Sequence, residues 1–201
     1  MVSDPTLRTE LVLAGHRGQT ELPRRHLDHV DPALRAVALS ALERTGTLDD
    51  DDVAAALRDP DPSVRRTALQ FAARRPGLSL TALLEDADPT VVEVAAWACG
   101  EQETVTDPVF DQLCALVRTH DDALVRESAV AALGAIGDER GEATVLAALD
   151  DKATVRRRAV LALAAFSGPG VEPALRRALD DRDWQVRQGA EDLLVARGDL
   201  D

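Results

Sequence analysis

The sequence predicts an all-helical protein built from stacked pairs of helices. A five-residue motif recurs seven times along the 201 residues, and apolar residues follow each copy at helical spacing. Hydrophobic residues make up 45% of the chain but aromatic residues only 2%, so the core must consist of Ala, Leu and Val. Small side chains let helices approach closely, which suits packed helical hairpins better than a β-sandwich.

The recurring motif is Asp-Pro-x-Val/Leu-Arg, with some variation between copies. Asp is a favoured helix N-cap and Pro fits the first helical position, so each copy is expected to begin a helix. The Val or Leu then enters the core. In the seven copies, the last position of the motif is occupied by Arg8, Arg35, Arg65, Val92, Arg126, Arg156 and Arg187, at intervals of 27, 30, 27, 34, 30 and 31 residues.

A second helix is expected before each motif helix except the first. These partner helices are predicted at residues 21–30, 50–58, 78–86, 108–119, 140–149 and 171–179. The first motif helix, residues 4–14, has no partner before it. The prediction is therefore about six helical pairs plus an N-terminal half repeat. One pair cannot bury both of its apolar faces alone, so it is stable only within a stack.

The most regular pair, residues 122–151, carries the resemblance to a known family. Its motif, the following Ala-x-x-Ala-Leu-Gly and the Gly-Asp-Glu-Arg turn from Gly137 to Arg140 resemble HEAT repeats of the PBS-lyase HEAT-like class. This resemblance implies a right-handed α-α superhelix, the HEAT-like α-solenoid, with the second helix of each pair lining the concave face. Glu191 replaces an apolar residue in the last copy, as in a terminal repeat. We therefore expect residues 1–201 to form a single HEAT-like domain.

The charge balance excludes several function classes. The formal net charge is −13, and Lys152 is the only lysine. Such a surface is unsuited to nucleic acid or to anionic membranes, because both need cationic side chains. Neither a signal peptide nor a spanning segment is present, so we expect a cytoplasmic monomer. Abundant Asp with almost no Lys resembles the cytosolic proteins of salt-adapted archaea, although a GC-rich bacterial genome would also favour Arg.

Potential metal and catalytic residues do not form recognisable sites. His26 and His29 are one helical turn apart but no third ligand clusters with them. The run Asp49 to Asp52 lacks the spacing of a calcium loop and fits a helix start. Cys99 and Cys114 fit buried free thiols. No Ser-His-Asp or Cys-His arrangement and no phosphate loop stands out. The sequence thus predicts no enzyme, no metal and no cofactor.

An enzyme or enzyme-accessory protein on a HEAT-like scaffold remains the alternative. Deoxyhypusine hydroxylase carries its metal on His-Glu dipeptides, but the four histidines here precede Arg17, Leu27, Val30 and Asp121. A DNA glycosylase needs a basic groove, which this acidic chain does not match. A lyase of the phycobilin type stays open, although no chromophore-handling residue is recognised. The motif arginines are assigned to structure, bridging carboxylates of neighbouring turns.

The strongest functional signal lies five and nine residues after each motif Asp, where side chains should point into the concave groove. This row is mixed rather than apolar, as a binding surface is. Trp97 lies at its centre; it either anchors a partner or folds inward to fill space. Trp184 is interpreted as a packing residue at a helix start. We predict a non-enzymatic scaffold or adaptor that binds a protein or peptide through Arg66, Gln70, Glu93, Trp97, Glu127, Arg157 and Leu161.

Overall fold

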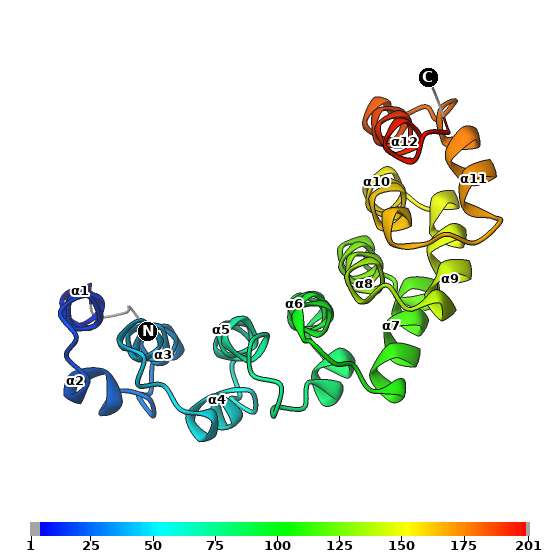
Figure 1. Ribbon diagram of the computed structural model, residues 1–201. Coiled ribbons are helices and arrows are strands. Elements are labelled where there is room, and N and C mark those ends of the chain that lie inside the picture. The colour runs from blue at the N-terminus through cyan, green and yellow to red at the C-terminus, as the bar shows by residue number, and fades with distance from the viewer. Residues whose placement is uncertain (1–4, 200–201) are drawn as a thin grey trace. The chain divides into compact units, whose positions relative to one another are not determined.

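The computed structural model describes residues 5–199, and all regular structure within them is helical (Figure 1). The α-helices are α1 (Pro5–His16), α2 (Glu21–Arg24), α3 (Pro32–Thr45), α4 (Asp50–Ala56), α5 (Pro62–Ala72), α6 (Pro89–Glu101), α7 (Asp107–Thr119), α8 (Ala123–Ile136), α9 (Glu142–Ala147), α10 (Ala153–Ala162), α11 (Val171–Ala178) and α12 (Trp184–Arg197). Short 3₁₀ helices are η1 (Thr81–Glu85), η2 (Glu139–Gly141), η3 (Ala148–Asp150) and η4 (Leu163–Ala165).

The motif begins helices as the sequence predicts. Asp31, Asp61, Asp122 and Asp183 each have extended backbone and accept a hydrogen bond from the backbone N–H two residues later. These caps satisfy a donor that the first helical turn leaves free. Gly137 ends α8 with a positive φ of 66°, a conformation that glycine adopts without steric cost. The motif helices are α1, α3, α5, α6, α8, α10 and α12.

Contacts divide the chain into two compact units, Met1–Ala95 and Ala96–Asp201. In the first unit α1, α3 and α5 lie side by side, with α2 and α4 in a second layer (Figure 1). In the second unit α8, α10 and α12 lie side by side, and α7, α9 and α11 form the second layer. The described segments confirm the α-solenoid class and the expected six pairs after a half repeat. A single domain over residues 1–201 stays a prediction.

The core consists of small and aliphatic side chains, so neighbouring motif helices approach closely. Leu133 of α8 and Val160 of α10 are almost completely buried. A Cβ added at Gly134 would lie 2.7 Å from the Cβ of Ala162 and 2.9 Å from its Cα. Gly15 of α1 makes the same kind of approach to Ala41 of α3. The shortage of aromatic residues therefore reflects tight helix packing.

Two predicted partner helices differ from the structure. The helix expected over 21–30 ends at Arg24, because side-chain bonds hold the next residues in turns. The His26 Nδ1–H donates to the Leu22 carbonyl at 2.7 Å, and His29 Nδ1 accepts the Asp31 N–H at 3.0 Å. The helix expected over 78–86 is the shorter 3₁₀ helix η1, which buries Leu83 and Leu84.

The described helices include none that is both long enough and apolar enough to cross a membrane.

Candidate functional site

The seven predicted binding residues all lie outside the core. Arg66 and Gln70 are exposed on α5, and Glu93 and Trp97 lie one turn apart on α6. The Trp97 side chain is 39% exposed, so the alternative in which it folds inward is wrong. The remaining three residues are the half-buried Glu127 of α8 and Arg157 of α10, and Leu161 of α10, which is 58% exposed.

A pocket in the second unit brings three of the seven together. It lies between α8, α10 and α12 and has a volume of about 390 Å³. We call it the α8–α10–α12 groove. Its lining residues are Glu127, Thr154, Arg157, Arg158, Leu161, Trp184, Gln185, Gln188, Gly189 and Asp192. Arg66, Gln70, Glu93 and Trp97 are not among these lining residues.

Trp184 is the groove residue that the sequence-based interpretation missed. It is the first residue of α12, its side chain is 65% exposed and it lines the groove, so the prediction of a packing residue is wrong. The position in the motif contained the signal. Val186 is buried two residues later, and two residues turn a helix by about 200°, so a side chain at position 184 must point away from the core.

The arginines of the groove are paired, Arg157 with Asp183 beside the groove and Arg158 with Glu127 inside it. Arg157 Nε donates to Asp183 Oδ1 at 2.9 Å, and its Nη2 donates to Asp183 Oδ2. These hydrogen bonds lower the pKa of Asp183 far below its ordinary value and raise that of Arg157. Arg158 Nη2 lies 3.3 Å from Glu127 Oε1. The arrangement neutralises the groove walls and leaves Trp184 and Leu161 as its exposed apolar points.

Polar capacity remains at two places in the groove. Arg158 Nε is buried and has no hydrogen-bond partner within the part of the chain that the structure describes. Gln188 Nε2 donates to Asp192 Oδ1 at 2.8 Å, which leaves the carbonyl of this exposed amide available to accept. Apolar anchors beside the exposed Gln188 amide suit contact with a peptide. They do not assemble a nucleophile with a base.

Four motif arginines form the structural bridges that the sequence predicts. Each donates through Nε and Nη2 to both oxygens of an aspartate in the turn before the next motif helix, at 2.6–2.8 Å. Each also donates through Nη1 to a backbone carbonyl in the turn before its own helix. The pairs are Arg35–Asp59, Arg65–Asp86, Arg126–Asp151 and Arg156–Asp181.

The fourth motif copy departs from this pattern. Val92 replaces the arginine and is 2% exposed. The turn before the next motif helix has His120 two residues before the motif Asp, and His120 Nδ1 accepts the Asp122 N–H at 3.1 Å, as His29 Nδ1 accepts the Asp31 N–H at 3.0 Å. Asp59 accepts the Asp61 N–H in the same way, at 2.8 Å. An imidazole thus serves as the turn acceptor at His29 and His120, whereas a carboxylate does so at Asp59, Asp86 and Asp181.

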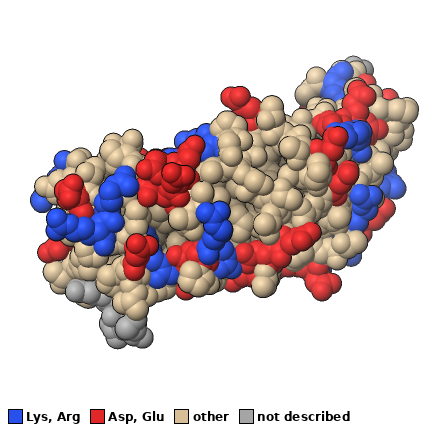
Figure 2. Space-filling model, turned by 90° about the horizontal axis from the view of Figure 1, so that it is seen from below, with Lys and Arg blue, Asp and Glu red and all other residues tan. Residues whose placement is uncertain are grey.

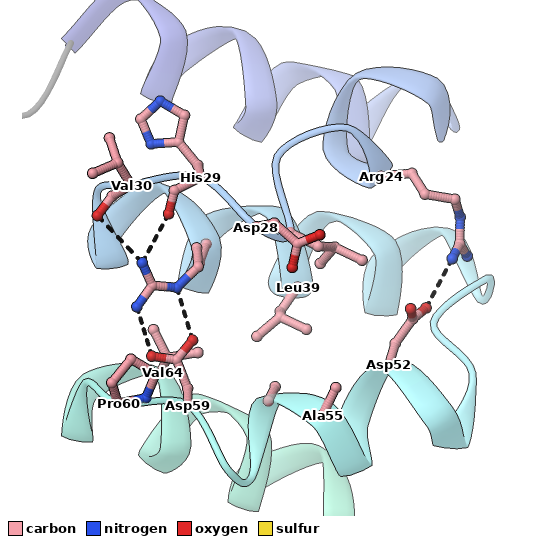
Figure 3. A pocket seen from close by; sticks show the side chains of 13 residues that line it. Arg24, Asp28, His29, Val30, Leu39, Asp52, Ala55, Asp59, Pro60 and Val64 are labelled. Carbon is pink, nitrogen blue, oxygen red and sulfur yellow. Dashed lines mark hydrogen bonds and ion pairs between the residues drawn. The ribbon is translucent and has the colours of Figure 1, made fainter.

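A second pocket, in the first unit, is a structural feature. It has a volume of about 460 Å³ and its wall contains the Arg35–Asp59 pair (Figure 3). Arg35 Nη1 also donates to the carbonyls of His29 and Val30, and Arg24 Nη1 donates to Asp52 Oδ2 at 2.9 Å. The charged groups of this pocket are therefore largely paired with each other.

Figure 2 shows basic side chains beside acidic ones over the face that it draws.

The other candidate residues have structural roles. Asp49 caps α4 by accepting the Asp52 N–H at 2.8 Å, as expected of a helix start. Cys99 and Cys114 are buried free thiols, and burial raises the pKa of Cys99 to about 12, which makes it unreactive. His26 and His29 stack at 5.7 Å between ring centroids. Over residues 5–199 no three or more His, Cys, Asp or Glu side chains are grouped to hold a metal ion.

A family model described as HEAT repeats matches residues 51–133, 78–154 and 142–201. These matches together cover 51–201, three quarters of the chain. No curated protein matches the chain.

Solved structures similar to this chain are helical-repeat proteins at low identity. YibA of Escherichia coli has a TM-score of 0.61 at 20% identity. The match covers 75% of this chain and 59% of YibA. A designed armadillo repeat protein in complex with the peptide (KR)4 has a TM-score of 0.59 at 20% identity, over 88% of this chain and 99% of its own. Human deoxyhypusine hydroxylase in complex with glycerol has a TM-score of 0.51 at 19% identity, over 96% of this chain and 79% of its own. At these identities the likeness shows the fold alone.

Proposed function

Because the chain belongs to the HEAT-repeat family, we propose that it is a non-enzymatic scaffold that binds a protein or peptide partner through its motif helices. Stacked repeats provide an extended surface whose side chains vary while the core stays constant. One structurally similar protein, the designed armadillo repeat protein, was solved with a peptide bound. The proposal assigns the same kind of use to the exposed side of α8, α10 and α12.

The exposure of Trp184 and Leu161 in one groove carries this proposal. The two side chains are 65% and 58% exposed, on neighbouring helices, and both line the pocket of about 390 Å³. Large apolar side chains at the centre of a polar rim are the residues on which binding energy concentrates. We propose that they anchor the partner, with Glu127 and Arg157 at the rim. Arg66, Gln70, Glu93 and Trp97 are proposed as further contacts.

An enzymatic or enzyme-accessory role has less support. Human deoxyhypusine hydroxylase shares the fold at 19% identity, but the His-Glu dipeptides expected of that activity do not occur in this sequence. The residues lining the α8–α10–α12 groove include neither His nor Cys. Its Arg157 and Asp183 are engaged in a bidentate pair rather than poised for proton transfer.

Affinity capture tests the proposal. The tagged protein is compared with a Trp184→Ala/Leu161→Ala variant as bait in a lysate of the source organism. We expect the variant to lose partners that the wild type retains, because it lacks both apolar anchors while its core is unchanged. The control is Val195→Ala/Arg58→Ala, which removes exposed side chains outside the groove. Circular dichroism confirms that each variant is folded. Equal recovery of every partner by wild type and anchor variant contradicts the proposed site.

A further inference from the structure

Arginines recur at one repeat position in the first unit. Arg17, Arg44 and Arg74 each lie 13 residues after a motif Asp, at the C-terminal ends of α1, α3 and α5. A fourth, Arg66, lies two turns before Arg74 on α5. We call Arg17, Arg44, Arg66 and Arg74 the arginine face.

The side chains of the arginine face are not paired within the chain. All four side chains are exposed, and none forms an ion pair with an acidic residue in the described part of the chain. The adjacent Arg75, by contrast, is bound by Glu43 at 2.6 Å and Asp50 at 3.2 Å. Arg66 lies close enough to Asp88 to help lower the pKa of that carboxyl, but it forms no ion pair with it. In a chain with a net charge of −13, four arginines outside ion pairs are available for an external carboxylate.

The four arginines lie on three neighbouring helices or within two residues of their C-terminal ends. Helices α1 and α3 pack together, as do α3 and α5, and they form one layer of the first unit (Figure 1). The positions five, nine and 13 residues after the motif Asp of each helix carry no acidic residue. The other five positions, which separate the arginines with small or uncharged side chains, are Thr9, Leu13, Ala36, Ser40 and Gln70. These nine positions therefore carry positive charge alone, within an acidic protein.

We propose that the arginine face binds an acidic segment, rich in Asp or Glu, of the partner protein. Guanidinium groups bind carboxylates through two parallel hydrogen bonds, which a bare arginine supplies and an arginine already paired cannot. This inference rests on the proposed function and specifies the partner's chemistry. Nucleic acid is disfavoured because no aromatic side chain occupies these positions to stack on bases, and because the net charge repels a long polyanion.

The spacing of the helices sets the length of the segment. Two helix-to-helix steps of about 8–10 Å separate the outer helices by roughly 16–20 Å. About six residues of extended chain span that distance at roughly 3.3 Å each. A six-residue acidic peptide is therefore long enough to reach from α1 to α5.

Fluorescence anisotropy with fluorescein-labelled hexaglutamate provides the test. We expect saturable binding at low salt that weakens as salt is added, because the contacts are exposed charges. Arg44→Gln/Arg74→Gln should weaken it about tenfold through the loss of two charged contacts. The matched control is Arg58→Gln/Arg182→Gln, which removes two other exposed arginines that lie outside ion pairs between described residues and should leave affinity within about twofold.

Three results would overturn the inference: absence of saturable hexaglutamate binding, equal weakening by both variant pairs, or tighter binding of a labelled six-nucleotide oligothymidine than of hexaglutamate. These outcomes are separable from failure of the proposed function. The capture experiment depends on Trp184 and Leu161 in the second unit, whereas Arg44 and Arg74 lie in the first. Unchanged melting temperatures show that the variants are folded.

Discussion

Arg156 shows what the motif arginine contributes at the level of a single residue. Its side chain is 5% exposed and donates to Asp181 at 2.8 Å through Nε and Nη2 and to the Asp151 carbonyl at 2.7 Å. A charge this far from water is tolerated only when its hydrogen bonds are satisfied. The bridge joins the turn before α10 to the turn before α12, so it fixes the spacing between adjacent repeats.

Replacing this arginine should destabilise the fold strongly. We expect Arg156→Met to lower the free energy of unfolding by about 3–5 kcal/mol, because Asp181 then keeps a poorly solvated charge without its partner. The exposed Arg58→Met serves as control and should change it by less than about 0.5 kcal/mol. Urea titrations followed by circular dichroism measure both. A loss below about 1 kcal/mol for Arg156→Met would show that the bridge contributes little.

The same bridges make stability depend on pH. Hydrogen bonds from Arg126 and Arg156 hold the pKa values of Asp151 and Asp181 below the ordinary range. In the unfolded chain both carboxyls titrate near about 3.9, so in acid the folded protein binds fewer protons than the unfolded one. The contribution of these bridges to the free energy of unfolding is therefore complete above about pH 4. It is lost as the pH falls through the folded-state pKa values of the two carboxyls.

Urea titrations from neutral pH to about pH 3 measure this dependence. Asp181→Asn should lower stability at neutral pH and flatten the decrease in acid, since it removes one of the titrating groups. Asp111→Asn, at an exposed acid on α7, should leave the slope unchanged. If the stability of Asp181→Asn ran parallel to that of the wild type at every pH, the acid loss of stability could not be attributed to Asp181.

At the scale of elements, glycines allow neighbouring motif helices to touch. Gly134 of α8 lies against Ala162 of α10 with no room for a methyl group. In an open helix, alanine would be favoured over glycine by about 0.5–1 kcal/mol. Here packing overrides helix propensity.

Gly134→Ala should therefore destabilise the protein by about 1–3 kcal/mol, because α8 and α10 must separate to accept the new Cβ. Gly77→Ala is the matched control: nothing lies within 4 Å of a Cβ built there. Thermal melts of both variants give the comparison. An increase in melting temperature for Gly134→Ala would mean that propensity, not interhelical contact, dominates at this site.

Most of the motif helices were predictable because they have a local start signal, although Lys152 at the start of α10 forms no side-chain cap. An Asp cap and, in several copies, Pro at the first position define where they begin, whatever lies around them. The partner segments have such signals less regularly: Asp49 caps α4, whereas no side-chain cap hydrogen bond forms at the start of α2 or η1. Side-chain bonds of His26 and His29 end α2 early, and the short segment at η1 adopts the tighter 3₁₀ form. Whether such side-chain bonds or a 3₁₀ turn replace an α-helix depends on local geometry, which the spacing of apolar residues does not reveal.

At the scale of the whole molecule, the repeat register predicted which residues are accessible but not which of them meet. It placed Leu161 at the surface correctly and left open whether Trp97, which is exposed, folds inward. It could not give the distance between α10 and α12, which brings Leu161 and Trp184 to one groove. The same repeat register could also have predicted the arginine face, because three of its arginines lie 13 residues after a motif Asp, four residues beyond the last position considered. The net charge of −13 is typical of salt-adapted proteins, and that origin stays a prediction.

Hydrogen–deuterium exchange of the protein with and without its captured partner tests the central claim, that the α8–α10–α12 groove is a binding site. Contact at the groove should slow amide exchange in α8, α10 and α12, because a partner bound to these helices stabilises them against local opening. Helices α9 and α11, in the second layer, should change less. Protection concentrated in α9 and α11, with α10 and α12 unchanged, would contradict the account.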